Sequence, residues 1–182
     1  MNKKILFATV FILALFPFRI NAQGIEKGYH GFVDAGYSFE VLDATLGFDW
    51  VEVNTIHGYQ ATPNIFIGAG VGLHFFPEVK RGHLRNDYYM WERNSSTEIP
   101  LFADFRWTVL NKKITPFVDL RAGHCVSDGS GTYLSAGAGG RLAIKNNMGV
   151  YFMISYSTHQ KVKYDSEEDG NSAITARLGF DF

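Results

Sequence analysis

The chain has 182 residues and a formal net charge of −1, with 17 Lys and Arg against 18 Asp and Glu. The balanced charge argues against nucleic acid as a partner, and the length fits a single domain. Cys125 is the only cysteine in the sequence, which excludes an intrachain disulfide.

Residues 1–22 predict a cleaved signal peptide. A basic start at 2–4 and an apolar run at 5–18 precede Ala22, which offers a cleavage point. The run of about 14 residues is too short for a membrane-spanning helix, which needs about 20. We therefore expect residues 23–182 to leave the cytoplasm as one mature domain.

Alternation of apolar and polar residues predicts strands from Gly28 onward, since successive side chains of a strand point to opposite faces. The first strand covers residues 29–39. The second, roughly 45–60, changes phase at Trp50, and one extra residue in the strand would account for the change. We therefore expect a β-bulge near Trp50.

The third strand, residues 65–75, has apolar residues at every odd position and glycines at positions 68, 70 and 72 of the other face. Glycine is normally unfavourable inside a strand, because it has no side chain to pack and loses much entropy on folding. Alternating glycines fit a crowded inner face, as in a narrow barrel filled by side chains from opposite strands.

Five further strands bring the total to about eight strands of about ten residues, the length of a tilted strand that crosses a bilayer. They cover roughly residues 98–109, 114–123, 134–144, 150–156 and 173–182. The turns near Thr62, Asn111 and Lys145 are short, whereas the connections 79–97 and 160–172 are long and polar. Short turns at one end and long loops at the other are typical of outer-membrane barrels, whose short turns face the periplasm. An even strand number then predicts that both termini are periplasmic.

The last predicted strand, Ala173–Phe182, ends the sequence on an aromatic residue. One of its faces is entirely apolar and the other is mostly polar. Because no later element covers the apolar face, we expect lipid to cover it.

These patterns resemble the small eight-stranded outer-membrane barrels, such as the OmpX family and the transmembrane domain of OmpA, and in particular the barrel domains of Bacteroidetes. The resemblance covers residues 23–182 and implies an all-β, antiparallel, up-and-down transmembrane barrel. It also implies that the last strand is a recognition signal for the barrel-assembly machinery, matched here by Thr175, Phe180 and Phe182. Arg177 stands where glycine is usual in that signal. Outer-membrane lipid and lipopolysaccharide are the other partners that the resemblance implies.

Eight charged residues share the inward phase of the predicted strands. They are Asp34, Asp104, Arg106, Asp119, Arg121, Arg141, Arg177 and Asp181. A charge that faces lipid at mid-membrane costs roughly 2–4 kcal/mol, so their common phase supports the predicted register. We expect a network of paired charges that plugs the narrow lumen, and a small polar or gated pore is the alternative.

Tyr88, Tyr89 and Trp91 stand among arginines in the longest predicted loop. They are candidate contacts for an extracellular ligand or surface, because such residues are enriched at interfaces. An aromatic girdle at the membrane surface explains them equally well. Both interpretations place this loop at the outer side of the barrel.

A lipid-A-modifying outer-membrane enzyme is the main catalytic alternative, because some such barrels have this size and carry Ser and His on the outer surface. His124, His159, Ser127 and Ser157 are expected near the outer rim and are the candidates for such a pair. The sequence does not bring any of them within the hydrogen-bonding reach that a nucleophile and its base require. A secreted lipocalin-like ligand binder is a further alternative, and the charged inner face argues against it.

The six histidines show no metal-ligand spacing, and the acidic residues at 165–169 lack the spacing of a calcium-binding hand. We therefore expect no metal, no cofactor and no catalytic residue. The function predicted from the sequence is that of an integral outer-membrane β-barrel with a structural or surface-interaction role.

Overall fold

The computed structural model describes residues 25–41, 49–78, 95–109, 113–127, 131–145, 148–161 and 170–182. The predicted signal peptide, residues 1–22, and the loop residues Tyr88, Tyr89 and Trp91 lie outside these ranges. Within the ranges, no helix is long and apolar enough to cross a membrane.

The described residues form nine strand segments. They are β1 (Gly28–Glu40), β2 (Trp50–Thr62), β3 (Ile65–Phe76), β4 (Ser96–Glu98), β5 (Pro100–Thr108), β6 (Ile114–Cys125), β7 (Gly131–Lys145), β8 (Met148–Lys161) and β9 (Gly170–Asp181). Both β4 and β5 pair with β3, and only Ile99 separates them, so they are two segments of one barrel strand. The nine segments therefore make an eight-stranded barrel.

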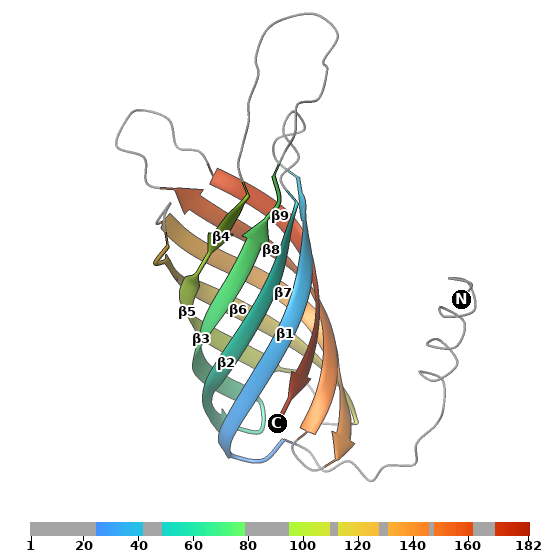
Figure 1. Cartoon of the computed structure of the whole chain (residues 1–182). Coiled ribbons are helices and arrows are strands. Elements are labelled where there is room, and N and C mark those ends of the chain that lie inside the picture. The colour runs from blue at the N-terminus through green and yellow to red at the C-terminus, as the bar shows by residue number, and fades with distance from the viewer. Residues whose placement is uncertain are drawn as a thin grey trace, which may run out of the picture.

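The first and last strands close the barrel. Every pairing is antiparallel, and β1 pairs with both β2 and β9. Phe182 extends this seam: its N–H donates to the carbonyl of Gly31 at 3.0 Å, and the N–H of Gly31 donates to the carbonyl of Phe182 at 2.9 Å. Figure 1 shows β1 and β9 side by side in a cylinder of tilted strands. The predicted eight-stranded antiparallel barrel is confirmed.

The β-bulge predicted near Trp50 is wrong. Trp50 pairs with Ser38, and the register between β1 and β2 continues without a shift to Gln60. The side chain of Trp50 is fully buried, on the inward face that it shares with Glu52. A large aromatic side chain suits the lumen as well as it suits contact with lipid. The sequence pattern therefore could not show to which face Trp50 points. The register shift recorded in β2 lies between Gln60 and Thr62, where the chain turns into β3.

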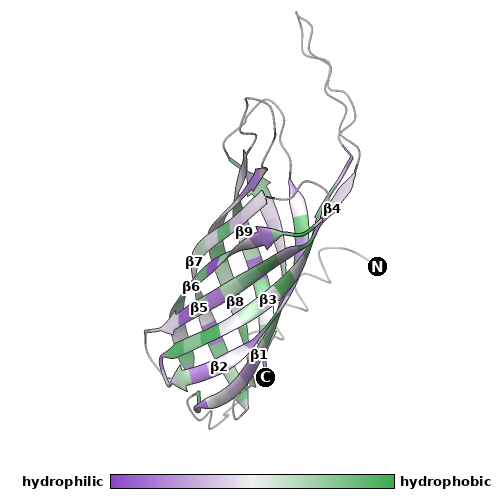
Figure 2. Cartoon of the chain, turned by 90° about the vertical axis from the view of Figure 1, so that its left-hand side faces the viewer, coloured by the Kyte–Doolittle hydropathy of each residue, from purple (hydrophilic) through white to green (hydrophobic). Residues whose placement is uncertain are grey.

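The outer face of the barrel is apolar and exposed. Leu178 is 67% exposed and Ile154 is 53% exposed, although both lie within long strands. Figure 2 shows hydrophobic and hydrophilic residues mixed along each strand, as two faces of opposite polarity require. Tyr29, Tyr59 and Trp107 are exposed near the end where β1 begins and β9 ends, a position that suits an aromatic girdle.

Side chains fill the inside of the barrel. The largest apolar cluster consists of Phe32, Ile56, Phe66, Phe102, Phe117, Cys125, Tyr133, Tyr151 and Met153. Glycines of β3 make room for it: a Cβ on Gly70 would lie 2.6 Å from a ring carbon of Phe102 and 2.9 Å from Cγ1 of Ile56. The alternating glycines therefore reflect a crowded interior.

Candidate functional site

All eight charged residues that the sequence assigns to the lumen are buried there, and none is more than 4% exposed. They form three groups at successive levels along the barrel axis. One group lies near the end where β9 finishes, a second occupies the middle, and the third surrounds Arg177. Each group pairs its charges differently.

Asp181 is the centre of the group near the carboxyl end of β9. The Nε and Nη2 atoms of Arg141, on β7, donate to its Oδ2 at 2.9 and 2.6 Å. The Nε2 atom of His30, on β1, lies 3.1 Å from the same oxygen. This carboxylate therefore links three strands of the barrel wall.

Arg121 holds the middle group together. Its Nη2 lies 2.6 Å from Oδ2 of Asp34, and its Nε lies 3.0 Å from Oδ1 of Asp119 and 3.2 Å from Oδ2 of Asp104. The Tyr151 hydroxyl also donates to Asp34, at 2.9 Å. Because Arg121 is on β6 and Asp34 is on β1, which are not neighbouring strands, this ion pair crosses the lumen.

Arg106 combines an ion pair with aromatic packing. Its Nε donates to Oδ2 of Asp119 at 2.9 Å, and its Nη2 lies 2.8 Å from the same oxygen. The guanidinium carbon lies 4.1 Å from the ring centre of Phe32 and 4.5 Å from those of Phe117 and Tyr151. A desolvated cation over aromatic faces gains about 2 kcal/mol or more, so the rings hold this guanidinium as well as enclosing it.

Arg177 pairs with a residue outside the predicted set. Its Nε donates to Oε1 of Glu52, which is fully buried. Its remaining hydrogens donate at 2.6–3.0 Å to the hydroxyls of Ser135, Ser155, Ser157 and Tyr133. The signal for Glu52 was present in the sequence, because the residue lies between the outward-facing Val51 and Val53 and so shares the inward phase.

Two of the histidines lie next to each other in space, although they are far apart in the sequence. His74 and His159 lie 3.0 Å apart, Nδ1 to Nε2, at the end of the lumen away from Asp181. His159 also contacts Glu98 and Cys125, on two other strands. Spacing along the chain could not find this group, since each member comes from a different strand.

The serine and histidine candidates for catalysis are divided between the two faces. Ser157 and His159 are buried in the lumen, where Ser157 accepts a hydrogen bond from Arg177. His124 is exposed, and the Ser127 hydroxyl accepts a hydrogen bond from the N–H of Ile99 at 3.1 Å. Across the described ranges, no hydrogen bond joins a serine of this set to one of its histidines.

The three residues of the predicted assembly signal also lie on both faces. The Thr175 hydroxyl is buried, 2.8 Å from that of Ser38, and donates to Ser157 at 3.1 Å. Phe180 and Phe182 lie on the outer side with their rings stacked, 6.2 Å between centroids. The two aromatic residues are thus placed where lipid or another protein can reach them.

A closed β-barrel with an apolar exterior and a charged interior defines the class of integral membrane β-barrels. No protein-family model matches the sequence, and no curated protein matches it. The outer membrane enzyme PagL matches the fold with a TM-score of 0.59 and 10% identity, over 81% of this chain and 97% of that one. Neisserial surface protein A matches with a TM-score of 0.52 and 13% identity, over 86% and 97%. The chain thus has the fold of small eight-stranded outer-membrane barrels.

Proposed function

We propose that this protein is an integral outer-membrane β-barrel with a structural or surface-interaction role, a plugged lumen and no catalytic activity. The observation that carries the proposal is the opposite polarity of the two faces of its strands. Burial of four arginines and their carboxylates inside, with exposed aliphatic residues outside, is stable only if the surroundings of the barrel are apolar.

The contacts across the lumen support a plug over a pore. Arg121 reaches from β6 to Asp34 on β1, and Arg106 is enclosed by rings of three other strands. Opening a path for ions or solutes would separate these pairs in a poorly hydrated interior. Breaking one buried ion pair costs about 3–5 kcal/mol, so the closed lumen is the stable state.

The partners proposed for the barrel follow from its surfaces. Outer-membrane lipid and lipopolysaccharide would cover the apolar exterior, and the barrel-assembly machinery would read the closing strand with Phe180 and Phe182. Both termini would be periplasmic after removal of residues 1–22. The loop with Tyr88, Tyr89 and Trp91 remains the candidate contact for an extracellular ligand or surface, and nucleic acid is not expected as a partner.

Membrane fractionation followed by gel electrophoresis with and without boiling tests this proposal. We expect the protein in the outer-membrane fraction, with a band that changes mobility on boiling because the folded barrel resists detergent. A soluble periplasmic protein whose mobility does not change on boiling would contradict the proposal.

The orientation has its own test. A protease-sensitive tag inserted between Asn86 and Asp87 should be cleaved on intact cells, while the barrel keeps its mobility shift. The matched control is the same tag at Pro63, in the two-residue turn between β2 and β3, which should be protected until the outer membrane is opened. The reverse pattern would invert the orientation.

A further inference from the structure

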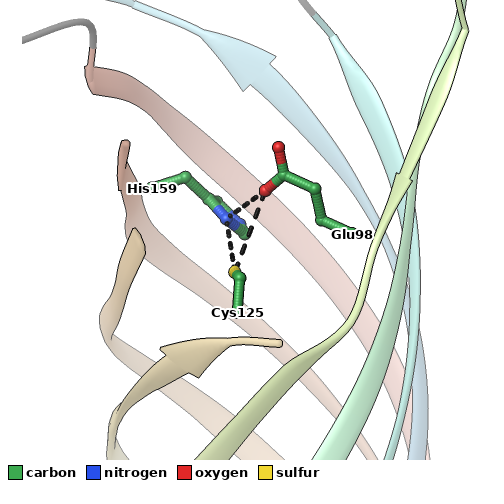
Figure 3. Close-up of side chains that lie close together, drawn as sticks. All are labelled: Glu98, Cys125 and His159. Atoms are coloured by element: carbon green, nitrogen blue, oxygen red, sulfur yellow. Dashed lines mark hydrogen bonds and ion pairs between the residues drawn. The ribbon is translucent and has the colours of Figure 1, made fainter. Parts of the chain in front are cut away.

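Three side chains with metal-binding atoms meet inside the lumen, at the end away from the carboxyl terminus. Glu98 comes from β4, Cys125 from the last position of β6 and His159 from β8, and Figure 3 shows their donor groups pointing toward one another. Each residue is only 2% exposed. Oxygen, sulfur and nitrogen donors therefore converge in a site shielded from water.

The distances within this group fit one face of a metal coordination tetrahedron. The Nδ1 atom of His159 lies 3.0 Å from Oε2 of Glu98 and 3.5 Å from Sγ of Cys125, and this sulfur lies 3.8 Å from the same oxygen. Tetrahedral zinc bonds of about 2.0–2.3 Å place ligand atoms roughly 3.3–3.6 Å apart. Shifts of a few tenths of an ångström would complete the three bonds.

A chain of hydrogen bonds orients the imidazole of His159. The amide nitrogen of Asn54 donates to Asp34 at 2.8 Å and to Glu52 at 3.1 Å, which leaves the amide oxygen to face Nε2 of His74 at 3.2 Å. That Nε2 must therefore carry a hydrogen. The Nδ1 atom of a neutral His74 then accepts from Nε2 of His159, 3.0 Å away.

This orientation leaves Nδ1 of a neutral His159 without a hydrogen. Its lone pair then faces a carboxylate oxygen of Glu98, which lies 3.0 Å from Nδ1. Two acceptors at this distance repel each other unless a proton or a cation lies between them. A thiol hydrogen on Cys125 can be shared with one of them and does not remove the repulsion. A hydrogen bond at the other ring nitrogen that fixes the tautomer in this way is typical of metal-binding histidines.

We propose that Glu98, Cys125 and His159 form a binding site for one transition-metal ion, of which Zn²⁺ is the best match. A thiolate with an imidazole selects zinc over magnesium or calcium, which prefer oxygen ligands. Three protein ligands leave the fourth position for water or for a small ligand. The rings of Trp50 and Phe76 pack on His159, with centroids 5.4 and 5.8 Å away, and help to enclose the site.

Cobalt substitution tests the site directly. The detergent-folded protein is freed of metal with a chelator and titrated with Co²⁺, and metal content is then measured after saturation with Zn²⁺. We expect one ion per chain and a near-ultraviolet charge-transfer band from the bond between cobalt and the Cys125 sulfur. The Cys125→Ser variant should lose this band while keeping the mobility shift of a folded barrel.

Two further variants keep the test specific. His124→Gln changes the exposed neighbour of Cys125 on the same strand and should leave the band and the stoichiometry unchanged. His74→Phe removes the orienting partner of His159 and should weaken metal binding about 10–100-fold without abolishing the band. The proposal is overturned if the folded protein shows no cobalt–thiolate band and no stoichiometric zinc, which would mean that a proton alone joins Glu98 to His159. A band that persists in Cys125→Ser would overturn it too.

Discussion

The inner and outer faces of the same strands have opposite polarity and opposite exposure. On β8, Met153 and Ser155 face the lumen and are at most 3% exposed, whereas Phe152 and Ile154 face outward and are at least 50% exposed. The inner face accepts charge only as pairs and hydrogen-bonded groups. The outer face of the described strands is mainly apolar, because lipid offers polar groups no partner, and polar groups on it such as Tyr29 and His57 pair with each other.

The face of the strand on which a charged residue lies therefore decides whether its charge can be satisfied. A guanidinium such as that of Arg177 is stable inside because Glu52 and four hydroxyls satisfy it. The same group one residue away would face the bilayer. Variants that disturb one face at a time test this difference.

Removal of Arg121 should have the largest effect. Arg121→Met leaves Asp34, Asp104 and Asp119 buried without their shared cation, and we expect a loss of about 3–5 kcal/mol in the free energy of unfolding. Urea unfolding of the protein in lipid vesicles measures it. The double variant Arg121→Met with Asp34→Asn should recover part of the loss. A loss below about 1 kcal/mol would show that the pairs are not enclosed.

A charge added to the outer face should cost less, and its cost should depend on depth. Ile154→Arg places a cation at the middle of β8 and should lower the free energy of unfolding by about 2–4 kcal/mol. Gln160→Arg, an exposed position near the end of the same strand, should cost about 0–1 kcal/mol and serves as the control. Equal costs at both positions would contradict a bilayer around the barrel.

Arg106 is held by an ion pair and by aromatic packing, and a variant that keeps only its charge separates the two contributions to stability. Arg106→Lys retains a cation for Asp119 but gives up the planar stacking on Phe32, Phe117 and Tyr151. We expect a loss of about 2 kcal/mol, measured by the same unfolding assay. A loss close to zero would mean that the rings add nothing beyond the ion pair.

Deletion of Phe182 should affect the finished barrel no more than Arg106→Lys does, and it should affect assembly more. It removes two backbone hydrogen bonds to Gly31, each worth about 1 kcal/mol. Phe182→Ala keeps those bonds and removes only the ring. If the ring is part of the assembly signal, both variants reduce the amount of barrel in the outer membrane; normal levels of Phe182→Ala would assign no role to the ring.

The sequence predicts the faces of this barrel well, because a strand has a period of two residues and a one-residue error would put charges such as Arg121 into lipid. The ion pairs were not predictable. Arg121 and Asp34 are 87 positions apart on strands that are not neighbours, so their contact depends on the tilt and stagger of the whole barrel. The phase change at Trp50 was misinterpreted as a β-bulge because aromatic residues suit both the lumen and the lipid.

The group of Glu98, Cys125 and His159 was missed for the same reason as the ion pairs. Its members are separated by 27 and 34 positions, so no short motif marks them. The members come from strands on one side of the barrel, with β7 between β6 and β8, so their meeting depends on the curvature of the wall. In the sequence, Glu98 shares the alternating phase of the inward-facing Asp104 and Arg106, and this is the part of the site that periodicity can reach.

Electrical recording in planar lipid bilayers shows whether the charged lumen is a plug or a path for ions. We expect the folded protein to insert, to retain its mobility shift and to give no discrete conductance steps above the bare membrane. Arg121→Met, if folded, serves as a comparison with a weakened plug. Stable ohmic conductance from the unaltered protein would contradict a closed lumen and identify the barrel as a small pore.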